Sequence, residues 1–209
     1  LPILLIMILT HYFPSDLLQI SNLDELSKSI TKYSPEKQKK IAEQLSNYSG
    51  RALRRFDPDQ FENYIKRRNQ TEKWLYNAFL EIGGYPVSQH PFYCVLGENK
   101  YLYHDFGENT VALQLDTAEI SEYHLSFTLG DSVGIYFSSA SKRIYTLKQI
   151  SSLLADTTYI KKQMQHLNRY HQYIEAQLWS TKYIPNAKII KNYPLLIHYI
   201  FISYIFQQN

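Results

Sequence analysis

Apolar and polar residues alternate most regularly over residues 172–179 of this chain. A period of two is typical of a half-buried strand, with one face in the core and the other in solvent. The residues expected in the core are Ile174, Ala176 and Leu178. The residues expected on the opposite face are Tyr173, Glu175, Gln177 and Trp179. The pattern therefore places an acid and an amide on one face, framed by two aromatic rings.

The first part of the chain has the apolar spacing of helices. Residues 15–50 are predicted to form two helices, with Leu23 and Leu26 on the inner face of the first. The second begins at Ser34, a good N-cap that is followed by a proline in the first turn. We therefore interpret residues 1–50 as an N-terminal helical annex.

A longer helix is predicted over residues 58–82, because apolar residues recur on one stripe and two glycines follow it. Arg68 and Glu72 occupy inward positions of this stripe, one turn apart, and burying an ion pair is costly. A competing interpretation breaks the segment at Asn69 and starts a new helix after Thr71. Under either interpretation, Arg68 is anchored near a core surface.

After the two glycines the pattern changes to strands and turns. The continuous apolar run 92–96 predicts a strand covered on both faces, and the alternation at 111–115 and 123–129 predicts two more. Residues 134–137 are interpreted as a further strand. Helices are expected over two later segments, 147–155, capped by Thr146, and 158–169.

These elements lack the regular β-α-β alternation of a doubly wound fold. The predicted fold class is α+β, with a mixed, mainly antiparallel sheet and flanking helices in a core domain over residues 51–190. Residues 191–209 are expected to form an apolar C-terminal element. Because residues 1–9 are apolar as well, membrane contact through the two ends is a minority alternative.

The amino-acid composition excludes only a few classes of protein function. The net charge of +3 is too small by itself to imply a nucleic-acid partner. The single cysteine, Cys94, excludes an internal disulfide, and no group of cysteines and histidines has the spacing of a metal site. We therefore expect a cytoplasmic protein without a metal.

Basic residues concentrate in the segments 51–55 and 66–68, near the aromatic residues Tyr64, Trp74 and Tyr76. Aromatic rings beside positive charges suit stacking on nucleic-acid bases. One interpretation of the chain is therefore a non-catalytic module that binds nucleic acid or a protein through these two segments. A solvated helix face is the simpler explanation of such a charge cluster.

The chain contains none of the common glycine-rich, zinc-protease, serine-hydrolase or kinase motifs. The order of its shorter motifs resembles the ADP-ribosyltransferase fold, and specifically the toxin family that ADP-ribosylates thymidine in DNA. That family has an arginine-rich segment, a Pro-Phe-Tyr strand, an apolar strand, a Phe-Thr turn, a leucine-rich helix and a strand with the catalytic glutamate. The similar segments here are 66–68, 91–93, 111–115, 126–131, 147–154 and 169–177.

The resemblance implies an enzyme that transfers ADP-ribose from NAD to a macromolecular acceptor in a toxin or defence setting. The partners that it implies are nucleic acid, as the acceptor, or an antitoxin-like protein. Glu175 would be the catalytic glutamate, which orients the nicotinamide ribose and stabilises its developing positive charge. Arg68 or Arg67 would hold the NAD phosphates. Tyr93 would form a wall of the nicotinamide site, and Gln177 would also contact the cofactor.

Two parts of the family pattern differ in this chain. The family's early Tyr-His-Ile-Thr strand, which contacts NAD, has no predicted counterpart. The arginine that follows the Pro-Phe-Tyr strand in the family is replaced by the run 95–98. Both differences concern residues that contact NAD in the family. The interpretation as an NAD-dependent enzyme therefore depends on whether other residues of this chain form an NAD site.

Overall fold

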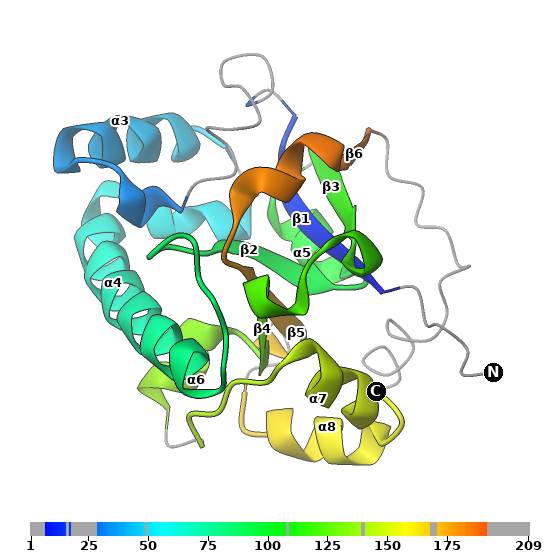
Figure 1. The fold of residues 1–209 in the computed structure, drawn as a ribbon. Helices are drawn as coiled ribbons and strands as arrows, with labels where there is room; N and C mark the ends of the chain where they lie inside the picture. The colour runs from blue at the N-terminus through cyan, green and yellow to red at the C-terminus, as the bar shows by residue number, and fades with distance from the viewer. Residues whose placement is uncertain are drawn as a thin grey trace.

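The computed structural model describes residues 7–15, 17, 29–48, 50–107, 109–138, 141–167 and 171–191. Its helices, 3-10 helices (η) and strands form an α+β fold (Figure 1). In chain order they are β1 (Ile8–Pro14), η1 (Ile30–Lys32), α3 (Pro35–Leu45), η2 (Arg51–Phe56), α4 (Pro58–Glu81), β2 (Phe92–Leu96), α5 (Lys100–Asp105), β3 (Thr110–Asp116), η3 (Thr117–Glu119), η4 (Glu122–His124), β4 (Leu125–Leu129), α6 (Ser132–Phe137), α7 (Leu147–Leu153), α8 (Thr157–Met164), β5 (Ile174–Leu178), η6 (Thr181–Asn186) and β6 (Lys188–Ile190).

The strands form one six-stranded sheet in the order β4-β5-β2-β1-β3-β6, and the named strand pairs are antiparallel. β1 pairs with β3 along its whole length. With β2 it pairs only at Leu9, opposite Leu96, and at Thr10, opposite Val95. The two central strands therefore separate after Thr10, and this split opens the sheet near its middle.

The position of β1 corrects the prediction of a wholly helical segment over residues 1–50. Residues 8–14 form a strand in the interior of the sheet, and Leu9 is completely buried. Branched and aromatic residues such as Thr10, Tyr12 and Phe13 favour the extended backbone. The predicted helix with Leu23 and Leu26 lies outside the described residues, as do residues 192–209 of the predicted C-terminal element.

The two faces of the sheet have different covers. One face is apolar and packs against α7 and α8, with Phe127, Ile150 and Ile160 in its core. Figure 1 shows α7 and α8 together beneath β4 and β5, and α3 and α4 to the side of the sheet. On the other face the ring of Trp179, which directly follows β5, stacks on Phe79 of α4 at 5.5 Å between centroids.

This cover corrects the expected exposure of β5. The strand was predicted to have a solvated face, but all five of its residues are buried. β5 lies between β4 and β2 in the sheet, and α4 covers the face that carries Glu175 and Gln177. The prediction that these two side chains share a face is confirmed, because Nε2 of Gln177 donates a hydrogen bond to Oε1 of Glu175 at 3.0 Å.

The single long helix over residues 58–82 is confirmed as α4, and the competing break near Asn69 is wrong. Thr71 does not cap a new helix, because its hydroxyl donates to the carbonyl oxygen of Arg67 one turn earlier at 3.0 Å. The helix ends at the glycine pair. Gly83 has φ +87°, a backbone conformation that side chains disfavour, and Gly84 lies so close to Phe79 that a Cβ would collide with its ring.

Other helix predictions depend on capping residues. Ser34 caps α3, and Thr146 forms a capping box with Gln149 at the start of α7, as the sequence indicates. The predicted strand over residues 134–137 is wrong, because this segment belongs to α6. Its N-cap is Asp131, whose Oδ1 accepts a hydrogen bond from the backbone N–H of Gly134 at 2.7 Å.

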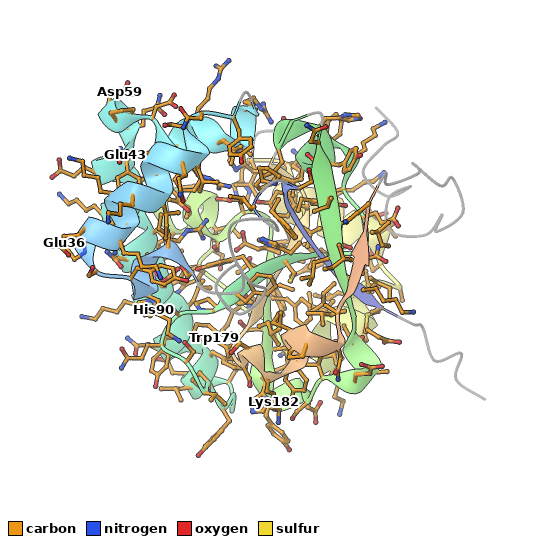
Figure 2. All side chains as sticks on the ribbon, turned by 90° about the horizontal axis from the view of Figure 1, so that it is seen from above. Glu36, Glu43, Asp59, His90, Trp179 and Lys182 are labelled. Carbon is orange, nitrogen blue, oxygen red and sulfur yellow. The ribbon has the colours of Figure 1, made fainter. Side chains whose placement is uncertain are left out.

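The outer sides of the helices are polar. Figure 2 shows Glu43 on α3 and Asp59 on α4 pointing away from the sheet, and both are exposed. In the part of the chain that the structure describes, no helix combines the length and the apolar character that crossing a membrane requires.

Candidate functional site

A cavity of about 710 Å³ lies where β1 and β2 separate, and α3, η2 and α4 contribute to its walls. This volume is typical of small-molecule sites. Its lining has two chemical parts. The apolar part includes Leu45, Leu53 and Phe56, which pack together in one cluster. The polar part that is central to the site comes from several elements and includes His11, Arg55, Arg68, Tyr93, Asp131, Tyr173 and Glu175. The exposed residues Glu36, Lys37 and Lys40 of α3 also line the cavity.

Glu175 lies in the polar part and is only 4% exposed. Its Oε1 accepts hydrogen bonds from Nε2 of Gln177 at 3.0 Å and from the backbone N–H of Ser132 at 3.4 Å. Burial raises the pKa of Glu175 to about 7 and the negative charge of Asp131 adds to the rise, against the opposing charge of Arg68. The carboxyl group is thus fixed in position, and its charge is sensitive to pH near neutrality.

Arg68 lines the same cavity and is 6% exposed. Its guanidinium carbon lies 4.2 Å from the ring centroid of Tyr93 and 5.7 Å from that of Tyr64. One of its terminal nitrogens, Nη1, is buried without a hydrogen-bond partner. A buried guanidinium nitrogen without a partner is costly, so this side chain suits an anion brought by a ligand.

Glu72 does not pair with Arg68, although the two lie one turn apart on α4. Its carboxylate accepts hydrogen bonds from the hydroxyls of Ser29, at 2.7 Å, and Thr31. It also contacts Nδ1 of His90 at 2.7 Å and accepts from the hydroxyl of Tyr93 at 3.2 Å. Glu72 therefore holds Tyr93 in place beneath Arg68.

The structure brings together three of the five residues that the sequence assigns to the site: Arg68, Tyr93 and Glu175. Arg67 does not line the cavity, and its guanidinium packs on the ring of Phe137 at 4.5 Å. Gln177 does not line it either, because it is completely buried behind Glu175. Of the two neighbouring arginines, only Arg68 faces the cavity.

Sequence analysis missed the contribution of β1. Thr10 and His11 of β1 line the cavity. Sequence analysis predicted no counterpart to the early strand that contacts NAD in the family. Nδ1 of His11 donates to the carbonyl oxygen of Tyr93 at 2.8 Å, across the split between β1 and β2. Burial lowers the pKa of His11 to about 4, so its ring is neutral at pH 7. The sequence signal that could have revealed this contribution is the polar pair Thr10-His11, which directly follows the apolar residues 1–9.

Asp131 is a further carboxylate of the cavity, and sequence analysis did not assign it to the site. Its Oδ2 accepts from the hydroxyl of Tyr173 at 3.1 Å, and its Oδ1 lies 3.7 Å from Nδ1 of His171. Burial raises its pKa, but the contacts with His171 and the charge of Arg68 outweigh this and leave it below its usual range. Asp131 is therefore ionised when Glu175 is only partly ionised.

The two basic segments do not form one solvated surface. Arg51 is paired with Asp105 on α5, with Nε donating to Oδ1 at 3.1 Å. Arg55 and Arg68 line the cavity, whereas Arg54 is exposed. Some of the positive charges of these segments therefore lie in the cavity and not on the outer surface.

Comparison with protein-family models, curated proteins and solved structures gives no match to this chain. The residues of the site provide a partly ionised carboxyl group, an ionised carboxylate, a neutral imidazole and guanidinium groups around one cavity.

Proposed function

We propose that this chain is an ADP-ribosyltransferase-like enzyme that transfers ADP-ribose from NAD to a macromolecular acceptor, with nucleic acid as the first candidate. The observation that supports the proposal is that Arg68, Tyr93 and Glu175 line one cavity. These three residues are among the five that the order of motifs in the sequence assigns to the site.

In the proposed reaction, the glycosidic bond between nicotinamide and C1′ of its ribose breaks, and the bonding electrons leave with nicotinamide. Positive charge develops on the ribose, and the ionised carboxylate of Glu175 stabilises it. A nucleophilic atom of the acceptor then bonds to C1′ and releases a proton. Arg68 holds the NAD diphosphate, and the ring of Tyr93 forms one wall of the nicotinamide site.

The test is incubation of the protein with labelled NAD and single-stranded DNA, RNA or protein. Label transfer or NAD hydrolysis by the native chain should fall by about a hundredfold or more in Glu175→Gln, as expected for loss of a transition-state charge contact. Glu122→Gln is the matched control, because Glu122 is exposed on η4 and does not line the cavity. Absence of NAD turnover, or turnover unchanged in Glu175→Gln, would refute the proposal.

The same assay separates the alternative function. A binding module that uses the basic segments would bind nucleic acid in a salt-sensitive manner without consuming NAD. Nucleic-acid binding by such a module would be unchanged in Glu175→Gln. It would weaken in Arg54→Gln, since Arg54 is exposed to solvent and accessible to nucleic acid.

A further inference from the structure

Arg55 is a polar residue of the cavity to which the proposed function assigns no role. It lies on η2, is half-buried and lines the cavity together with Arg68. Its Nε is buried without a hydrogen-bond partner, as is Nη1 of Arg68. Oγ1 of Thr10, on the same cavity lining, is also buried and without a partner. Three hydrogen-bonding groups of the lining are therefore unsatisfied by the protein itself.

Aromatic rings hold the guanidinium of Arg55. Its central carbon lies 5.4 Å from the ring centroid of Phe56, 5.5 Å from that of Tyr64 and 5.9 Å from that of Phe106. Arg68 lies against Tyr64 too, at 5.7 Å. The two guanidinium groups thus lie against the same ring, although they come from different elements. Cation–π contacts of this kind position a guanidinium without using its N–H groups.

Carboxylates of the protein do not neutralise Arg55. Among the residues that the structure describes, none lies within ion-pair distance of it, and nearby Asp105 is engaged by Arg51. Its charge reaches across the cavity, since it adds to the effect of burial in lowering the pKa of His11. The charge of Arg68 is opposed by the carboxylates of Asp131 and Glu175, but Arg55 has no carboxylate of the described residues at ion-pair distance. A partly buried guanidinium of this kind is unfavourable unless an anion joins it.

We infer that Arg55 is a second diphosphate-binding residue of this site, which holds one phosphate of the dinucleotide while Arg68 holds the other. The inference rests on the proposed function and extends it to a residue outside the expected motifs. Guanidinium groups form paired N–H contacts with phosphate oxygens, and two of them from separate elements match a diphosphate better than a single phosphate.

Arg55 also determines the orientation of the dinucleotide in the cavity. The apolar cluster, with Leu53 and Phe56 from η2 and Leu45 from α3, lines the cavity and suits a flat base. Tyr93 and Glu175 come from the sheet. A diphosphate held by Arg55 and Arg68 places the adenosine end in the apolar part and the nicotinamide ribose at Glu175.

The experiment measures binding of ADP-ribose and of adenosine by isothermal titration calorimetry to the native chain, Arg55→Gln, Arg55→Lys and Arg54→Gln. ADP-ribose should bind Arg55→Gln roughly tenfold to a hundredfold more weakly, the usual effect of losing hydrogen bonds to a charged group. Arg55→Lys should recover part of the loss, and adenosine binding should change little. Arg54→Gln, one residue earlier on η2 but exposed, should behave as the native chain.

The outcomes distinguish this inference from the proposed function. If the native chain turns over NAD but Arg55→Gln binds ADP-ribose normally, the inference is wrong and the proposed function stands. If ADP-ribose binding depends on Arg55 but NAD is never consumed, the diphosphate site stands and the enzymatic proposal fails. If the native chain does not bind ADP-ribose, both are wrong. Thermal unfolding of each variant shows whether a loss of binding reflects a loss of folding.

Discussion

Gln177 donates a hydrogen bond from Nε2 to Oε1 of Glu175, at 3.0 Å, on the covered face of β5. The same nitrogen donates to Oγ1 of Thr128 at 3.2 Å, and its Oε1 accepts from the hydroxyl of Ser126 at 2.9 Å. Three partners thus fix the amide in one orientation. Gln177, which the sequence assigned to cofactor binding, instead positions the candidate catalytic carboxylate.

Replacing Gln177 by Met should therefore shift the pH dependence of turnover. Met keeps the volume but cannot donate a hydrogen bond to the ionised form of Glu175, whose pKa should rise above about 7. The pH of half-maximal kcat/KM should move upward by about one to two pH units, since a hydrogen bond to a charged group is worth about 1.5–3 kcal/mol and one pKa unit corresponds to ~1.4 kcal/mol. A lower rate at all pH values with an unchanged midpoint would contradict this role.

Asp131→Asn should shift the same midpoint in the opposite direction. The negative charge of Asp131 disfavours ionisation of Glu175, and Asn removes that charge while its carbonyl oxygen can still cap α6. The pKa of Glu175 should fall, so NAD turnover should reach its half-maximal rate at a lower pH. The measurement is a pH profile of kcat/KM for NAD hydrolysis. A midpoint that rises instead would show that Asp131 does not act on Glu175 through its charge.

The raised pKa of Glu175 also makes a prediction about stability. The folded pKa of about 7 exceeds the ordinary value of 4.5, so between these pH values the folded state binds more protons than the unfolded chain. The contribution of Glu175 to the free energy of unfolding therefore falls as the pH rises through this window. The environment also raises the pKa of His171 and lowers the pKa of His11 to about 4. The native chain must therefore be compared with Glu175→Gln, so that the contributions of the histidines cancel.

Urea unfolding at pH 5 and pH 8 isolates this contribution. The variant should gain stability relative to the native chain at the higher pH, by an amount on the order of 3 kcal/mol. An equal difference between the two proteins at both pH values would show that the environment of Glu175 does not alter its ionisation.

Local signals predicted several elements because their causes lie within a few residues. The caps Ser34 and Thr146 and the glycines after α4 are adjacent to the helix ends that they determine. The strand β1 was missed because its run Ile8–Pro14 follows directly on other apolar residues, and no turn residue separates them. Its place in the sheet depends on pairing with β3, about a hundred positions later, which periodicity does not reveal.

For the site residues too, local sequence signals do not reveal contacts between distant parts of the chain. Arg68 was predicted to face inward, since it lies on the apolar stripe of α4, and it is buried. The cavity role of Arg55 depends on rings from η2, from α4 and from Phe106 at the C-cap of α5, which only the folded chain brings together. Gln177 was misassigned because alternation identifies a face of a strand, not what covers it.

The two neighbouring arginines of α4 provide a direct comparison. Arg68→Gln should weaken NAD binding by about tenfold or more, because it removes a buried guanidinium from the cavity lining. Arg67→Gln should leave NAD binding close to native, since the guanidinium of Arg67 packs on Phe137 outside the cavity. Titration of each variant with NAD checks the difference. Equal losses in both variants would contradict the assignment of Arg68 alone.

Glu72 should be the most costly of the acidic residues of α4 to replace. It is 2% exposed and receives hydrogen bonds from Ser29, Thr31 and Tyr93. In Glu72→Gln the amide nitrogen cannot accept these bonds, so buried hydroxyl groups lose their partner. The free energy of unfolding should fall by about 2–4 kcal/mol, as expected when one partner of a buried charged network is removed.

Glu62→Gln is the control for this change, because Glu62 lies on the same helix and is exposed. Its effect on urea unfolding should remain within about 0.5 kcal/mol, as for most surface substitutions. Because Glu72 holds the hydroxyl of Tyr93, Glu72→Gln should also raise KM for NAD more than it lowers kcat. A variant as stable as Glu62→Gln would show that Ser29, Thr31 and Tyr93 do not depend on this carboxylate.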